Sequence, residues 1–375
     1  MSLSKYKPTR LNGHVEFIIP DVLGTTGVSG MYRRIAPTNQ RPVVPLSQIE
    51  SLAAKLTSWA EQCGFKNDHF ERFPIHTLSL TATQFAVVWL PDAPFESKKM
   101  EFFSRFLLWT WVLDDAMEES WRDGRMQTKN IATLQYIHET FFNIIRKVEI
   151  DEPLPYFPEY PDFATLCNCT KGMVASAEEV AGKENYVQAI EPFASTLEFF
   201  TKSCEWFTVS RVDKRYSLRT FHRWRVLNTG ADSVLEASAF ADGIQIPQNI
   251  RRNPAFMRMV NIMVTNVQLV NDVLGVKKDF NYKDGDPDNE IVFRVLRKGD
   301  PIDVAIAETC RIMDEELSDL ILIKQAVVDQ FGEEDEMLLR YLDKVDTFID
   351  GQNQVYVENV RYECDRGFVR LTREE

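Results

Sequence analysis

Apolar residues recur three or four positions apart through most of the chain, and this spacing is the feature that most limits its fold. Ser47 and Glu50 together predict a capping box, after which Leu52, Leu56 and Trp59 mark the inner face of a first helix. The second half of the chain carries no strand signal. The spacing therefore predicts an all-α fold of about ten helices. Further helices are expected over 77–90, from Pro94 through the acidic run at 114–119, and over 127–147, 163–181, 186–210, 217–241, 254–280, 301–329, 334–350 and 353–371.

The chain is expected to consist of an N-terminal arm and one helical domain. Residues 1–45 contain five prolines and no sustained period, which indicates an irregular arm. Residues 46–375 are expected to form a single all-α domain, because they carry no flexible linker and no internal repeat. The loop at 151–162, which contains four prolines, leaves a split into two domains as an alternative. At 375 residues and 44% hydrophobic content, the chain can bury a large core in either case.

Charge and cysteine content argue against several kinds of partner. A net charge of -13 without a basic stripe argues against nucleic-acid binding. No apolar run is expected to span a membrane, since the best one is interrupted by Arg105, and the N-terminus lacks an apolar signal core. The six cysteines are too sparse for a disulfide framework, and Cys167-Asn-Cys169 has no second pair to complete a zinc site. A cytoplasmic protein with reduced cysteines is expected.

An apolar run that begins at Arg105 ends abruptly in acidic residues. In a helix, Asp114 and Glu118 stand four residues apart on one face, with Asp115 beside them. Buried like charges repel, so such a group either binds a cation or is a solvated helix end. Both interpretations stay open on this stretch alone.

A second polar cluster lies within another apolar helix. Asn271, Gly275 and Asp279 are spaced four residues apart, so Asn271 and Asp279 share one face about two turns apart. Two separated oxygen ligands suit a hard cation such as Mg²⁺, which is held by a few protein oxygens together with waters and substrate phosphates. The alternative is a solvated helix end that runs into the loop 281–289.

Two arginines are candidates for binding phosphate. Arg225 precedes Gly230, a residue that can break a helix, and a guanidinium beside such a break is a suitable fork for phosphate oxygens. The alternative is an ordinary surface arginine. Near the C-terminus, Arg361 and Tyr362 place a second guanidinium beside a phenol donor.

Aromatic residues are dense around these clusters. Most large rings fill the core of any helical domain, but a subset that lines a pocket can hold a cation over the ring faces. Phe85, Trp89 and Phe106 are the candidates for such a lining, because they lie within a few turns of the acidic run or on the preceding helix.

Taken in order, these motifs resemble those of the class I terpene synthases, in particular the single-domain microbial and fungal enzymes. The resemblance covers residues 75–370. Asp114, Asp115 and Glu118 look like the aspartate-rich motif, and Asn271, Gly275 and Asp279 look like the second metal motif.

The resemblance extends to residues that contact the diphosphate in that family. Arg225 matches the diphosphate-sensing arginine, Asn228 the linker position, and Thr229 with Gly230 the effector position. Lys278 matches a lysine that touches diphosphate. The pair Arg361 and Tyr362 matches the C-terminal Arg-Tyr pair.

The sequence departs from the family pattern at two ligand positions. Gly275 has no side-chain oxygen where the family has serine or threonine, and Asp279 is one methylene shorter than the family glutamate. A water can fill the gap at Gly275, although this weakens metal affinity. The second cluster is not an Asp-Asp-x-x-Asp motif, which argues against a chain-elongating prenyltransferase.

The resemblance implies an all-α bundle around an apolar cavity. It also implies an enzyme that binds Mg²⁺, as three ions, and cyclises a linear prenyl diphosphate. Farnesyl diphosphate is the favoured substrate, which makes the chain a sesquiterpene synthase, with longer prenyl diphosphates as an alternative. Asp114 is the expected ligand, while Asp115 and Glu118 orient it or hold waters, and Glu119 faces solvent. A prenyltransferase and a non-enzymatic helical scaffold are the other hypotheses. Many members of the family form dimers, so a homodimer is left open.

Overall fold

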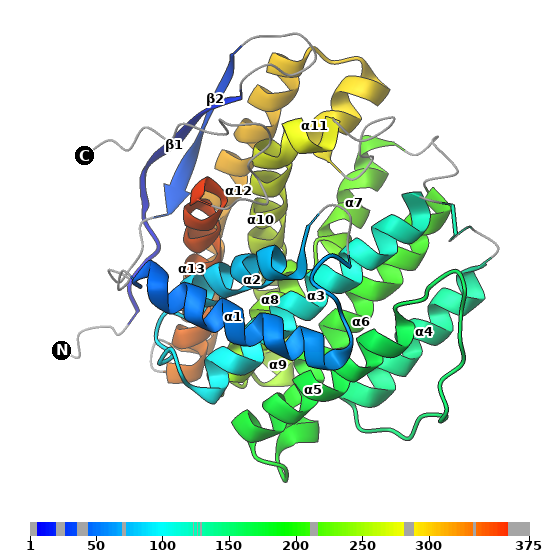
Figure 1. Ribbon diagram of the computed structural model, residues 1–375. Coiled ribbons are helices and arrows are strands. Elements are labelled where there is room, and N and C mark those ends of the chain that lie inside the picture. Colours follow the sequence, from blue (N-terminus) through cyan, green and yellow to red (C-terminus); the bar gives the residue numbers. More distant parts are fainter. Residues whose placement is uncertain are drawn as a thin grey trace. The chain divides into compact units, whose positions relative to one another are not determined.

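Helices make up most of the described chain in this computed structural model, which confirms the predicted fold class (Figure 1). The elements fall into two compact units. The central unit comprises residues 42–215 and 233–243, and the terminal unit comprises residues 1–41, 216–232 and 244–375. The structure describes residues 6–19, 27–35, 44–69, 73–122, 124–125, 127, 130–210, 217–280, 289–332 and 335–358.

The central unit is packed around the long helix that carries the acidic run, α3 (Lys98–Arg122). Its rings are buried against neighbouring helices: the ring centroids of Phe102 and Phe240 are 5.1 Å apart, and those of Phe106 and Phe193 are 4.8 Å apart. The apolar stripe predicted from the sequence therefore faces the core. The unit contains α1 (Leu46–Cys63), α2 (Ile75–Trp89), α3 (Lys98–Arg122), α4 (Ile131–Ile145), α5 (Phe163–Ala181), α6 (Tyr186–Ser210) and most of α8 (Ala231–Ala241).

The terminal unit is packed around α10 (Pro254–Phe280), which contacts α12 (Ile302–Phe331) and α13 (Glu336–Glu358). Buried residues such as Ile262, Met263, Val270 and Leu274 cover several faces of α10, as expected of a core helix. The unit contains β1 (Leu11–Ile19), β2 (Val28–Ile35), α7 (Leu218–Asn228), α9 (Gln248–Arg251), α10 (Pro254–Phe280), α11 (Glu290–Phe293), the short π-helix η2 (Arg294–Lys298), α12 (Ile302–Phe331) and α13 (Glu336–Glu358).

One described helix passes a membrane-span test by length and composition. This helix is the segment Pro254–Lys277 of α10, and 78% of its most apolar 18-residue stretch is buried inside the structure. The sequence-based expectation that no apolar run reaches this length was therefore too strict. The burial gives the reason for the composition, since α10 is the core helix of the terminal unit.

The N-terminal arm is not irregular throughout, so this part of the prediction was wrong. β1 and β2 form an antiparallel hairpin, with Phe17 opposite Gly30 (Figure 1). Val15, Phe17 and Ile19 are buried and alternate with exposed residues, which is the period of a half-buried strand. The five prolines do not prevent the strands, because all of them lie outside β1 and β2 in the sequence.

Other element boundaries also differ from the predicted ones. The capping box at Ser47 is absent, because α1 begins earlier, after Pro45, and no side chain caps it. The helix predicted over 217–241 is broken at Gly230, whose φ of 65° is the left-handed conformation that glycine adopts at low cost. α13 continues through the predicted gap between 350 and 353.

The alternative domain split at 151–162 does not match the two units, because this loop lies within the central unit. The chain instead enters the central unit after residue 41, leaves it after 215, and returns to it for residues 233–243. A single domain over 46–375 stays a prediction.

Candidate functional site

The first acidic motif lies near the C-terminal end of α3, in the central unit. Asp114 is partly exposed, whereas Asp115 is buried. Below them, the Tyr160 hydroxyl donates a hydrogen bond to the Leu113 carbonyl at 3.5 Å. Burial raises the pKa of Tyr160 well above its usual value, and the negative charges of Asp162 and Asp114 add to this effect. Tyr160 is therefore a neutral donor that contacts the backbone next to the motif.

This arrangement fits the predicted division of roles in the first motif. The more accessible carboxylate is Asp114, the expected metal ligand, and the inward-facing one is Asp115, the expected orienting residue. Both roles stay predictions. The side chains of Glu118 and Glu119 lie outside the described residues.

The second motif lies on α10, in the terminal unit. Asn271 is partly exposed, while Gly275 and Asp279 are buried. The amide nitrogen Nδ2 of Asn271 donates to the hydroxyl of Tyr356 on α13. This contact is made by the amide nitrogen. The amide oxygen of Asn271 is the atom that can ligate a cation.

Arg225 is not a surface arginine, so that alternative was wrong. Its side chain is only 12% exposed, and its guanidinium lies 2.9 Å from Oδ1 of the fully buried Asp272. Burial raises the pKa of Asp272 to about 6, while the Arg225 charge and the Glu290 N–H oppose the rise. The predicted diphosphate-binding arginine is thus held next to the residue that follows Asn271 in the second motif.

The predicted linker and effector residues lie where α7 ends. Asn228 is the last residue of α7, and the Thr229 N–H donates to the Arg225 carbonyl at 3.1 Å. Gly230 then turns the chain into α8. Arg225 and these three residues therefore lie at one helix break, and their roles stay predictions.

Sequence reasoning missed several polar residues that contact the second motif. Asn289 and Glu290 begin α11 and bind Asp279 and Asp272, and Tyr356 binds Asn271. Asp272 could be found from the sequence, since it lies within the motif. Asn289, Glu290 and Tyr356 are brought to the motif by the packing of helices, and no periodic pattern in the sequence marks them.

The candidate cavity residues are all buried in the central unit. The rings of Phe85 and Trp89 are 4.5 Å apart, and Phe85 is 5.3 Å from Trp111. Phe106 packs edge-on against Phe193. They belong to the aromatic core of the unit, and their role in lining a cavity stays a prediction.

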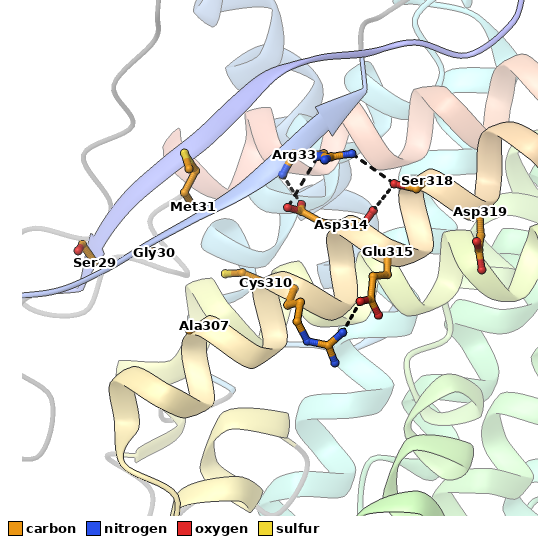
Figure 2. A pocket seen from close by; sticks show the side chains of 11 residues that line it. Ser29, Gly30, Met31, Arg33, Ala307, Cys310, Asp314, Glu315, Ser318 and Asp319 are labelled. Carbon is orange, nitrogen blue, oxygen red and sulfur yellow. Dashed lines mark hydrogen bonds and ion pairs between the residues drawn. The ribbon is translucent and has the colours of Figure 1, made fainter.

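A large hollow of the terminal unit lies elsewhere, between β2 and α12, and has a volume of about 510 Å³ (Figure 2). Four of its charged side chains form pairs: Nε of Arg33 lies 3.9 Å from Oδ2 of Asp314, and Arg311 binds Glu315. None of the described residues that line it is a predicted site residue. We therefore do not assign the chemistry to this hollow.

The donors of the two motifs fit a hard cation. Within the described ranges, no three His, Cys, Asp or Glu side chains are grouped closely enough to hold a metal ion. Mg²⁺ does not require such a cage, because it is held by one or two carboxylates together with waters and substrate phosphates. Asp114, Asn271 and Asp279 offer oxygen donors of this kind. The Lys278 side chain and both Arg361 and Tyr362 lie outside the described residues.

Comparison with known proteins gives these motifs a context. Residues 105–319 match the family model described as terpene synthase family 2, C-terminal metal binding. No curated protein sequence matches the chain significantly. Among solved structures, wild-type cucumene synthase is similar with a TM-score of 0.63 and 12% identity, over 86% of this chain and 98% of that chain. The linalool/nerolidol synthase from Streptomyces clavuligerus has a TM-score of 0.64 and 12% identity, over 85% and 98%.

These comparisons carry different weight. At 12% identity, the structural likeness establishes the fold. The family match covers more than half of the chain and contains Asp114, Arg225 and the second motif on α10.

Proposed function

The chain belongs to terpene synthase family 2, and from this premise we propose that it is a Mg²⁺-dependent cyclase of farnesyl diphosphate. As a terpene synthase it is a metal-binding lyase that acts on a prenyl diphosphate. The observation that carries the proposal is the buried pair of Arg225 and Asp272, which holds a guanidinium against the second metal motif. Three magnesium ions and a product of the sesquiterpene class are part of the proposal.

In the proposed reaction, the carbon–oxygen bond of the substrate breaks and its electron pair leaves with the diphosphate. Bound Mg²⁺ would supply charge neutralisation of this leaving group. In the central unit Asp114 would hold metal, and in the terminal unit Asn271 and Asp279 would hold metal, while Arg225 would bind diphosphate oxygens through its planar fork. Lys278, Arg361 and Tyr362 are proposed to bind the same group.

The remaining allylic cation would be folded and protected by apolar and aromatic side chains. Ring faces such as those of Phe85, Trp89 and Phe106 attract a cation, each by about 0.5–2 kcal/mol. Exclusion of water would let the cation cyclise before it loses a proton or is captured by water.

A product assay tests this proposal. The protein is incubated with Mg²⁺ and prenyl diphosphates of increasing chain length, diphosphate release is measured, and the extract is analysed by gas chromatography. Turnover of farnesyl diphosphate to a cyclic product is expected. Consumption of isopentenyl diphosphate would instead show a prenyltransferase, and turnover of longer substrates alone would show a di- or sesterterpene cyclase.

Two substitutions test the site. Asp114→Ala and Arg225→Lys are expected to lower turnover by about 100-fold or more, since the first removes a proposed metal ligand and the second weakens the grip on diphosphate oxygens. Lysine at 225 keeps a charge for the buried Asp272 but loses the planar fork. The controls are the exposed Asp151→Ala and Arg223→Lys, the latter on the same helix as Arg225. Full activity of either site variant would overturn the site assignment.

We also propose a cytoplasmic setting. The five described cysteines are buried, and we propose that they are reduced, while Cys364 lies outside the described residues. A homodimer stays a prediction, and light scattering would test it.

A further inference from the structure

Asn289 connects two acidic residues at the C-terminal end of α10. Its side-chain Nδ2 donates to Oδ2 of Asp279 at 2.8 Å and to the backbone carbonyl of Asp272 at 2.7 Å. Asn289 is 1% exposed and Asp279 is 4% exposed. One amide group therefore uses both of its N–H donors on the second metal motif.

The oxygen of the same amide is also used. Oδ1 of Asn289 accepts from the backbone N–H groups of Ile291 at 2.8 Å and Val292 at 3.1 Å, which caps the N-terminus of α11. The cap fixes the orientation of the amide, so its nitrogen can only face Asp279 and the Asp272 carbonyl.

The next residue extends this connection to α7. The Glu290 N–H donates to Oδ2 of Asp272 at 2.9 Å, and the other oxygen of Asp272 binds Arg225. The Glu290 carboxylate, which is fully buried, is held at 2.6 Å by both His222 and Arg294. The first turn of α11 thus joins the second metal motif and the diphosphate-binding arginine into one hydrogen-bonded network.

We propose that Asn289 is a positioning residue that holds the Asp279 carboxylate in the orientation needed to bind the metal. The inference rests on the proposed function of Asp279 as a ligand. Hydrogen bonds behind a ligand fix its rotamer, and their loss typically costs 10–100-fold in metal affinity. Positioning by Asn289 matters more here because aspartate at 279 is one methylene shorter than the family glutamate. The position of its carboxylate therefore depends more closely on the backbone of α10.

The test separates positioning from capping. Asn289→Ser keeps a good capping oxygen for α11 but is too short to keep both donations to the motif. The matched control is Asn253→Ser. Asn253 caps the other end of α10 in the same way, with Oδ1 accepting from Ala255 at 2.9 Å, and its Nδ2 binds Gln330. At 1.5 Å per residue, it lies about 40 Å along the helix from Asp279.

Two measurements are made on the full chain. Calorimetric titration with Mg²⁺ in the presence of inorganic pyrophosphate gives the metal affinity without turnover. Kinetics over a range of Mg²⁺ concentrations separate KM from kcat. Asn289→Ser is expected to weaken Mg²⁺ binding by about 10-fold or more, with kcat largely restored at saturating Mg²⁺. Asn253→Ser should match the wild type in both measurements.

Each outcome decides between the hypotheses. Unchanged Mg²⁺ affinity in folded Asn289→Ser would overturn the positioning role, whereas no Mg²⁺ binding by the wild type would overturn the proposed function itself. If Asn289→Ser does not fold, Asn289→Thr, which also carries a capping hydroxyl, is measured in its place. Loss of the fold in both variants would show a purely structural role and overturn the inference.

Discussion

At the scale of single residues, side chains from distant helices orient the second metal motif. Tyr356 accepts the amide hydrogen of Asn271 across 85 positions of sequence, and it is only 6% exposed. An asparagine amide can rotate by half a turn with little change in shape. The phenol on α13 accepts from the amide nitrogen, so in this orientation the amide oxygen is the atom of Asn271 that could ligate a cation.

Tyr356→Phe is expected to raise the Mg²⁺ concentration for half-maximal activity by about 10-fold, because the amide is no longer oriented. The fold should be kept, since the buried ring remains. Tyr32→Phe is the matched control: it removes a hydrogen bond of 2.7 Å from another tyrosine to Asn353 on the same helix. That control should lose stability without a change in Mg²⁺ dependence. An equal shift in both variants would contradict an orienting role.

At the scale of elements, an arginine joins α4 to α6 in the central unit. Arg146, just after the end of α4, binds Glu191 at 3.1 Å and Glu198 at 3.0 Å on α6. Arg146 lowers the pKa of Glu191, and Lys202 together with Arg146 lowers that of Glu198, with partial burial opposing both shifts. A lowered pKa in the folded state means that ionisation stabilises the fold.

The stabilisation by these carboxylates is present above their ordinary pKa and is lost as pH falls through the lowered folded-state pKa. Arg146→Met is therefore expected to cost about 1 kcal/mol of unfolding free energy at pH 7, because the pairs are partly exposed, and to cost much less near pH 3. Urea unfolding at a series of pH values measures this. Lys183→Met, an exposed residue of the same unit, is the control. A cost that does not change with pH would contradict the ionic origin.

At the scale of the molecule, the terminal unit is built from both ends of the chain. The buried ammonium of Lys324 on α12 donates to Asp346 on α13 at 2.7 Å and to Thr9, ahead of β1, at 2.6 Å. Burial raises the pKa of Asp346 and the Lys324 charge opposes the rise. The segment that leads into the hairpin is thus tied to helices more than 300 positions away.

Lys324→Met is expected to lower the unfolding free energy by about 3–5 kcal/mol, because it leaves a buried carboxylate without its cation. The double variant Lys324→Met with Asp346→Leu should recover most of this loss, since an apolar pair removes the buried charge. Lys298→Met, which breaks a more exposed pair with Asp300, should cost less than about 1 kcal/mol. Urea unfolding followed by circular dichroism measures all three. A loss of similar size in Lys324→Met and Lys298→Met would contradict the proposed contribution of the buried pair.

The sequence by itself determined the helical class, most helix ranges and the order of the motifs. These features depend on local spacing: apolar residues every three or four positions predict α3 and α10. The spacing did not separate α7 from α8, because it continues across the break at Gly230. The acidic run at Asp114 and the second motif at Asn271 were recognisable because their members lie within two turns of one helix.

The tertiary structure decided which side chains these motifs contact. Arg225 meets Asp272 across 47 positions, and Asn271 meets Tyr356 across 85. Asn289 approaches Asp279 only because α11 packs against α10. Such pairs depend on which helices pack together, and no local period reports that. The hairpin could not be predicted for the same reason, because the burial of its strands depends on packing against α12 and α13.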